Sequence, residues 1–128
     1  MMNEFSNKKL LLVDDEPNIL VPIEFLMKQQ GFVVEKAFNG QEALDKMKNY
    51  TPDIVILDVM MPKMNGFEVA KHIRANEKFT ATQIIFLTAK GTTQDKDTGY
   101  SAGGEVYLTK PFDNDELVSI VTEMAAYG

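Results

Sequence analysis

Five short apolar runs alternate with five longer segments that mix apolar and polar residues along this chain. Each run is four to six residues long and is bounded by polar or turn-forming residues. Such runs are typical of strands buried in a sheet. The predicted strands are 9–13, 32–37, 53–58, 83–88 and 106–109.

The intervening segments carry helical signals. Pro17 fits the first turn of a helix, and Gly31 is placed to end that helix. Pro22 lies inside the same segment, so we expect a bend there or a helix that begins late. Gly99 weakens the fourth helix. The predicted helices are 17–30, 41–49, 65–75, 93–102 and 113–126.

Strands that alternate with helices predict an α/β fold in which both faces of a parallel sheet are covered. We expect one domain over residues 1–128, with residues 1–7 as a flexible N-terminus. Ligand sites in open sheets of this kind lie beyond the carboxyl ends of the strands. Polar residues stand at four of those ends: Asp14-Asp15, Asp58, Thr88 and Lys110.

Composition narrows the range of partners. The formal net charge of −6 argues against nucleic-acid binding through a broad basic face, and against attraction to an anionic membrane. The chain contains no cysteine, which excludes disulfides and thiolate chemistry. No apolar run approaches the length of a membrane span, and the polar N-terminus lacks a signal-peptide core. We therefore expect a cytoplasmic protein.

The residues at the strand ends suggest phosphoryl transfer. Three carboxylates placed close together require a cation, and Mg²⁺ prefers carboxylate oxygens and bridges to phosphate. Asp14 and Asp15 are the natural metal ligands, and Asp58 can both touch the metal and attack phosphorus. Lys110 supplies a positive charge for phosphoryl oxygens, and Thr88 supplies a hydroxyl donor.

Four motifs in a fixed order extend this interpretation. They are the acid pair followed by Glu16-Pro17, Asp58-Val59-Met60-Met61-Pro62 with Asn65-Gly66, Leu87-Thr88-Ala89, and Tyr107-Leu108-Thr109-Lys110-Pro111-Phe112. With these motifs the chain resembles a response-regulator receiver domain of two-component signal transduction, similar to chemotaxis regulators. The resemblance covers residues 9–124. It implies a flavodoxin-like, doubly wound sheet of five parallel strands in the order 2-1-3-4-5.

The resemblance also implies the roles of individual residues. Asp58 accepts the phosphoryl group. Mg²⁺, or Mn²⁺ in its place, is bound by Asp14, Asp15, Asp58 and the backbone carbonyl of Met60. Thr88 and Tyr107 form a switch pair, and the peptide bond before Pro111 is cis. Met60 and Lys90 occupy two variable positions beside the path of the water that removes the phosphate.

A histidine kinase or histidine phosphotransfer protein is the upstream partner that the resemblance implies. An unknown downstream effector would read the face made by the last two helices and the fifth strand. Such a domain catalyses only its own phosphorylation and dephosphorylation and is not otherwise an enzyme. DNA-binding relatives often dimerise through that face by charged pairs. Residues 113–128 contain no lysine or arginine, and Val106 replaces a frequent aspartate, which disfavours that dimer.

Simpler interpretations stay open for single residues. The acid pair could cap a helix, Lys110 could be an exposed surface lysine, and Tyr107 could be a packing residue. For the whole chain, one alternative is a Mg²⁺-dependent phosphohydrolase with an aspartate nucleophile, although Met60 stands where those enzymes usually carry a second aspartate. Another alternative is a pseudo-receiver, an interaction module on the same fold that is not phosphorylated. A flavin-binding protein is disfavoured because no phosphate-binding loop follows the first strand.

Overall fold

The computed structural model describes residues 5, 7–89 and 91–127, and of Tyr127 only the backbone. Its centre is a sheet of five parallel strands in the order β2-β1-β3-β4-β5, which confirms the predicted strand order. Three strands have the predicted bounds to the residue. The strands are β1 (Lys9–Val13), β2 (Val33–Ala37), β3 (Ile54–Leu57), β4 (Gln83–Thr88) and β5 (Val106–Thr109).

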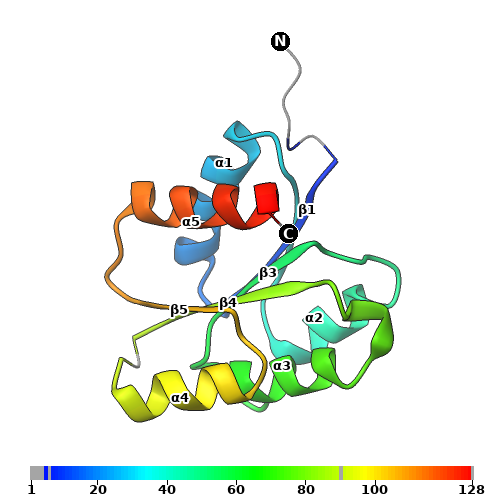
Figure 1. Ribbon diagram of the computed structural model, residues 1–128, viewed down its shortest axis with the longest axis vertical. Coiled ribbons are helices and arrows are strands. Elements are labelled where there is room, and N and C mark those ends of the chain that lie inside the picture. The colour runs from blue at the N-terminus through cyan, green and yellow to red at the C-terminus, as the bar shows by residue number, and fades with distance from the viewer. Residues whose placement is uncertain (1–4, 6, 90, 128) are drawn as a thin grey trace.

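Helices cover both faces of the sheet, as the alternation predicts (Figure 1). Helices α1 (Pro17–Gln29) and α5 (Asn114–Tyr127) lie on one face, and α2 (Gly40–Lys46), α3 (Gly66–Arg74) and α4 (Thr93–Ser101) lie on the other. A short 3₁₀ helix, η1 (Glu77–Phe79), precedes β4 and was not expected from the sequence. The doubly wound fold is therefore confirmed.

The strands bury both of their faces, which explains why they are apolar without alternation. Along β3 all four residues are buried, and β4 is buried from Ile84 to Thr88. Alternate side chains enter two separate clusters: Leu11 and Phe86 pack toward α2, α3 and α4, whereas Leu12 and Ile85 pack toward α1 and α5. The continuous apolar runs are thus required by burial on both sides.

Two helices form despite residues that disfavour them. Helix α1 begins at Pro17 and continues through Pro22, so the predicted late start is wrong. Helix α4 contains Gly99, but a capping box between Thr92 and Asp95 satisfies its first backbone N–H groups. Packing of α1 against the sheet, through buried Leu20, Ile23 and Met27, compensates for the backbone hydrogen bond that Pro22 cannot donate.

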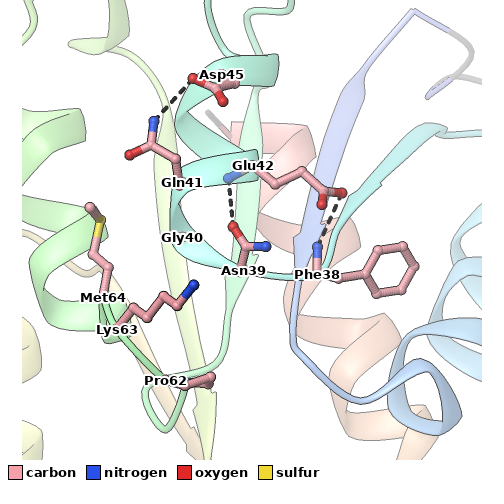
Figure 2. Close-up of a pocket in the computed structure, with 9 residues that line it drawn as sticks. All are labelled: Phe38, Asn39, Gly40, Gln41, Glu42, Asp45, Pro62, Lys63 and Met64. Carbon is pink, nitrogen blue, oxygen red and sulfur yellow. Dashed lines mark hydrogen bonds between the residues drawn. The ribbon is translucent and has the colours of Figure 1, made fainter.

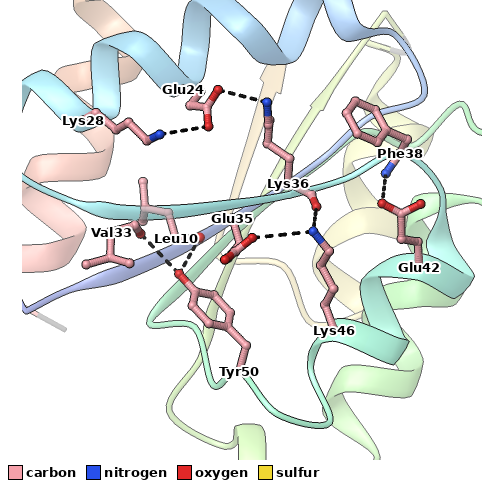
Figure 3. A network of polar contacts seen from close by, with 10 residues as sticks. All are labelled: Leu10, Glu24, Lys28, Val33, Glu35, Lys36, Phe38, Glu42, Lys46 and Tyr50. Atoms are coloured by element: carbon pink, nitrogen blue, oxygen red, sulfur yellow. Dashed lines mark hydrogen bonds and ion pairs between the residues drawn. The ribbon is translucent and has the colours of Figure 1, made fainter.

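The outer strand β2 is covered by a polar network (Figure 3). Lys36 pairs with Glu24 at 3.0 Å, and Lys46 contacts Glu35 and the carbonyl oxygen of Lys36. The Tyr50 hydroxyl donates to the carbonyl of Leu10 at 2.9 Å, and burial raises the pKa of Tyr50 to about 12, so this donor keeps its proton. Charged groups along an edge strand oppose pairing with another chain.

The segment before β1 has one core contact. Phe5 is buried, and its ring stacks on that of Phe32 with centroids 5.0 Å apart. Residues 1–4 and 6, to which the expectation of a flexible N-terminus also applies, lie outside the described residues. Within the part of the chain that the structure describes, no helix has the length and apolarity needed to cross a membrane.

Candidate functional site

The carboxyl ends of β1, β3 and β5 bring three charged residues together. Strands β1 and β3 pair in register up to Val13 and Leu57, so the next residues, Asp14 and Asp58, emerge side by side. The backbone N–H of Asp58 donates to the carbonyl of Val13 at 2.9 Å, which continues the ladder by one step. At the neighbouring strand end, the N–H of Lys110 donates to the carbonyl of Thr88 at 2.7 Å.

The side chains of these residues are in direct contact. The Lys110 Nζ lies 3.2 Å from Oδ2 of Asp14 and 3.9 Å from Oδ1 of Asp58. Asp14 is 2% exposed and Asp58 is 4% exposed, whereas carboxylates are rarely buried unless they are paired. Lys110 is therefore a partner of the acidic group and not the exposed surface lysine of the simpler interpretation.

Burial and mutual repulsion change the ionisation of both carboxyl groups. Burial, followed by the charge of Asp14, raises the pKa of Asp58 to about 6, and the nearby Lys110 opposes part of this effect. Burial also raises the pKa of Asp14, against the hydrogen bond from the Glu16 N–H and the charge of Lys110. One lysine does not neutralise two buried carboxylates, so the site keeps an excess of negative charge when both are ionised.

Asp15 and Glu16 extend the acidic group toward solvent. Carboxylate oxygens of Asp14, Asp15 and Glu16 all lie within 4.8 Å of one another, and Asp15 and Glu16 are exposed. Glu16 is the N-cap residue of α1 and makes no side-chain capping bond, while Asp14 accepts a hydrogen bond from the Glu16 N–H at 3.0 Å, directly before the helix. From the sequence, Glu16 was recognisable only as part of a motif. Its position directly after two acids was the available signal for a larger acidic group.

The loop after β3 is held close to Asp58. The Met60 N–H donates to Oδ1 of Asp58 at 3.3 Å, and the Met60 side chain is 53% exposed. A Cβ added to Gly66 would lie 2.3 Å from the carbonyl oxygen of Asp58, so only glycine allows α3 to begin against this strand end. Asn65 caps the same helix by a capping box with Glu68. The Asn65-Gly66 motif therefore fixes the path of the chain after Asp58.

The two predicted switch residues occupy neighbouring strands. Thr88 is fully buried at the end of β4, and Tyr107 on β5 is 7% exposed. The Tyr107 ring packs on Phe86 and Phe67, with centroids 5.9 and 6.5 Å away. Burial, followed by the charges of Asp95 and Asp58, raises the pKa of Tyr107 to about 12.

Two further predicted positions have different outcomes. The peptide bond between Lys110 and Pro111 is cis. Lys90 lies outside the described residues, so its predicted place beside the phosphate has no structural account.

A separate hollow lies beside the loop that follows Asp58 (Figure 2). Its volume is about 760 Å³, and it is formed between the loop before α2 and the loop before α3. The side chain of Lys63, a residue with φ of 69°, extends from the second loop toward the start of α2. The lining residues are Phe38, Asn39, Gly40, Gln41, Glu42, Asp45, Pro62, Lys63 and Met64, which include none of the predicted site residues.

Known proteins with similar sequences and folds indicate one family. The sequence profile of the response regulator receiver domain matches residues 10–122. The chain is 40% identical over 118 residues to response regulator Rre1 of Synechocystis sp., covering 91% of this chain and 51% of that protein. The chain thus spans about half the length of the curated relatives that it matches.

Solved structures give the same result. The chemotaxis protein CheY4 of Vibrio cholerae superposes with a TM-score of 0.86 at 33% identity, covering 91% of this chain and 98% of that one. The BeF₃-activated receiver domain of DrrB superposes with a TM-score of 0.85 at 29% identity, covering 93% and 97% of the two chains. Both similarities extend over more than nine tenths of this chain.

Proposed function

This chain belongs to the response regulator receiver domain family, and we propose that Asp58 is the residue that accepts its phosphoryl group. The observation that carries the proposal is the contact of a buried carboxylate at the end of β3 with a lysine and a second buried carboxylate. The donor would be the phosphohistidine of a histidine kinase or of a histidine phosphotransfer protein. Because this chain spans only about half the length of its relatives, the output of the whole protein is also a matter of proposal.

The acidic group fits a hard divalent cation. Asp14, Asp15, Asp58 and the backbone carbonyl of Met60 would hold Mg²⁺, and Glu16 lies close enough to contribute through water. Both oxygens of Asp14 already accept a hydrogen bond, one from Glu16 N–H and one from Lys110, yet each retains a lone pair. Bound Mg²⁺ supplies positive charge that compensates the buried carboxylates and the incoming phosphoryl oxygens.

The residues of this chain account for the transfer itself. An oxygen of ionised Asp58 forms a bond to phosphorus while the phosphorus–nitrogen bond of the phosphohistidine breaks and the nitrogen keeps the electron pair. Asp58, with a pKa of about 6, is mostly ionised at neutral pH. Lys110 would turn from Asp14 toward the new phosphoryl oxygens, and the Thr88 hydroxyl would donate to one of them.

Signal output would start at Thr88. If the Thr88 hydroxyl moves to the phosphoryl group, the space around the Tyr107 ring changes, because both residues stand on the adjacent strands β4 and β5. Tyr107 in turn packs against α4 through Gly99. The face formed by α4, β5 and α5 would therefore report phosphorylation to a downstream partner.

Intact-mass spectrometry after incubation with acetyl phosphate tests the acceptor. We expect wild type to gain one phosphoryl group in the presence of Mg²⁺ and not in excess chelator. Asp58→Asn should gain none, whereas Asp53→Asn, which changes a carboxylate at the other end of β3, should behave as wild type. Modification of Asp58→Asn would refute the assignment, and an unmodified wild type would favour the pseudo-receiver interpretation.

Turnover of a small phosphate ester separates the receiver from the phosphohydrolase alternative. A receiver retains the phosphoryl group on Asp58 and produces at most slow phosphate release, limited by loss of that group. Multiple rapid turnovers of the ester that depend on Asp58 would instead support the hydrolase.

A further inference from the structure

A shallow groove runs between the outer edge of β5 and helix α5. Figure 1 shows β5 as an outermost strand of the sheet, with α5 on one face and α4 on the other. The groove has a volume of about 380 Å³ and is lined by Gln83, Val106, Ile120, Glu123 and Met124. Three of these side chains are apolar, and Glu123 is exposed. The groove therefore offers apolar contact area beside a carboxylate.

Carboxylates dominate the elements that surround the groove. Together, α4, β5 and α5 contain five acidic residues and one basic residue, Lys96, so they carry a formal charge of −4 out of −6 for the chain. On α5, Glu116, Ile120 and Glu123 follow one another at spacings of four and three residues. This spacing places them on one side of the helix, and two of them, Ile120 and Glu123, line the groove.

Arg74, the one arginine of the sequence, does not neutralise this charge. The Arg74 Nη2 is 2.8 Å from a carboxylate oxygen of Glu105, and its Nε donates to the carbonyl of Gly103 at 3.0 Å. Its Nη1 donates to the carbonyl of Phe79, so all three nitrogens are engaged within the domain. Glu116 and Glu123, for which no ion pair is found among the described residues, remain available to a partner.

The charge pattern opposes a second copy of the chain on this face. A two-fold symmetric contact sets the same patch against itself, so Glu116 and Glu123 would meet carboxylates, and Lys96 is the one basic residue that α4, β5 and α5 contain. A partner with the opposite charge and an apolar side would match both properties of the groove. We propose that the β5–α5 groove binds a basic amphipathic segment of a partner protein, with lysine or arginine facing Glu116 and Glu123 and an apolar side chain between Val106, Ile120 and Met124.

This inference deepens the proposed function, on which it rests, because it gives the chemistry of the partner that reads the α4–β5–α5 face. Complementary charge at the rim of an interface speeds association and selects among partners, while the apolar contact slows dissociation. The groove lies at the N-terminal end of β5, whereas Asp58 lies at the carboxyl ends of the strands. Partner binding and phosphoryl transfer can therefore be measured separately.

Binding of a synthetic peptide tests the proposal. The probe is a fluorescent peptide of about 14 residues that forms an amphipathic helix, with leucine along one side and lysine along the other. A matched peptide carries glutamate in place of lysine. Fluorescence anisotropy is measured with wild type, Glu123→Lys and Ile120→Ser. Glu77→Lys is the matched control, because it makes the same change in net charge at an exposed residue of η1.

We expect the lysine peptide to bind wild type and the glutamate peptide not to bind. Glu123→Lys and Ile120→Ser should each weaken binding about three- to tenfold, while Glu77→Lys changes it less than about twofold. Circular dichroism checks that each variant is folded. Equal weakening by Glu123→Lys and Glu77→Lys would mean attraction to net charge alone and would overturn the proposal.

Two further outcomes are decisive. A chain that forms a dimer through this face, detected by sedimentation and abolished by Ile120→Ser, would overturn the proposal in favour of a second copy. If Asp58 is phosphorylated but the peptide does not bind the groove, this inference fails while the proposed function stands. If the peptide binds the groove but Asp58 accepts no phosphate, the proposed function fails instead.

Discussion

Gly99 and Tyr107 are packed so closely that the helix position admits no side chain. A Cβ added to Gly99 would lie 2.7 Å from Cδ2 of the Tyr107 ring and 3.2 Å from Cδ2 of Phe86. The glycine that weakens α4 as an isolated helix is therefore the feature that lets α4 approach β5. In this arrangement the Tyr107 ring is buried between Gly99 and the rings of Phe67 and Phe86.

Gly99→Ala should destabilise the domain and displace the Tyr107 ring. Alanine is favoured over glycine in a helix by about 1 kcal/mol, but overpacking of a core costs about 1–3 kcal/mol, so we expect a net loss of up to about 2 kcal/mol. Urea denaturation measures the loss, and NMR of the Tyr107 ring protons reports its displacement. Ser101→Ala, at an exposed position of the same helix, is the control and should be neutral or slightly stabilising.

Asp58 should make stability fall as pH rises, when no divalent cation is present. Its pKa is about 6 in the folded protein against an ordinary value of 3.8, so the folded state binds its proton more tightly. Stability contributed by protonated Asp58 is complete below about pH 4 and is lost as pH rises to about 6. At pH 7 Asp58→Asn should therefore exceed wild type by about 1–3 kcal/mol, and the difference should vanish near pH 4.

Urea denaturation in chelator at both pH values measures this difference. A smaller slope should persist in Asp58→Asn, because burial also raises the pKa of Asp14. Glu77→Gln, at an exposed position far from the site, should show the pH dependence of wild type. An advantage of Asp58→Asn that is equally large at pH 4 would contradict the assignment of this effect to Asp58 ionisation.

Mg²⁺ should stabilise wild type through the acidic group. A ligand that binds only the folded state at ten times its dissociation constant contributes about 1.4 kcal/mol. For a domain of this size that corresponds to a rise in Tm of about 3–6 °C. Thermal melts with and without millimolar Mg²⁺ should show this rise in wild type and in Asp97→Ala, and little or none in Asp14→Ala. An unchanged response of Asp14→Ala would place the metal elsewhere.

Thr88 should be required for the spread of the phosphorylation signal. In phosphorylated wild type, NMR shift changes should extend from the site over α4, β5 and α5. Thr88→Ala removes the hydroxyl that would donate to the phosphoryl group, so these changes should stay near Asp58. Thr88→Ser keeps the hydroxyl and should restore most of the spread. The same spread in Thr88→Ala as in wild type would show that another residue carries the switch.

The phosphoryl group on Asp58 should be long-lived. Hydrolysis needs a water in line with the phosphorus–oxygen bond, and the Met60 side chain, which is 53% exposed beside Asp58, offers no strong hydrogen bond to orient it. Lys90 is a donor only and cannot accept a proton while charged. Met60→Asn combined with Lys90→Glu should therefore lose phosphate about tenfold faster, below the range of full general-base catalysis.

Phosphate loss from phosphorylated protein, followed without any phosphatase, measures this rate. Met64→Asn, a change of the same chemistry farther along the loop, is the control for Met60→Asn and should leave the rate unchanged. A double variant that is no faster than wild type would show that these two positions do not control hydrolysis.

Local sequence pattern by itself determined the elements and the edge at which the site lies. The bounds of β1, β4 and β5 were predicted to the residue, because each apolar run is too short for a buried helix and is closed on both sides by polar residues. The approach of Asp14, Asp58 and Lys110 also followed from sequence, since parallel strands end at a common edge. The order of the strands came from resemblance to a family.

Tertiary structure alone decided the features that depend on residues distant in the sequence. The 3₁₀ helix η1, the continuous α1 around Pro22 and the stacking of Phe5 on Phe32 have no local signal strong enough to predict them. The raised pKa of Asp58 could not be predicted from its neighbours in the sequence either. It depends on the burial of two carboxylates and on Lys110, which is 96 residues from Asp14 in the chain. Hydrogen bonding and periodicity are set by neighbours in sequence, whereas packing and electrostatics are set by neighbours in space.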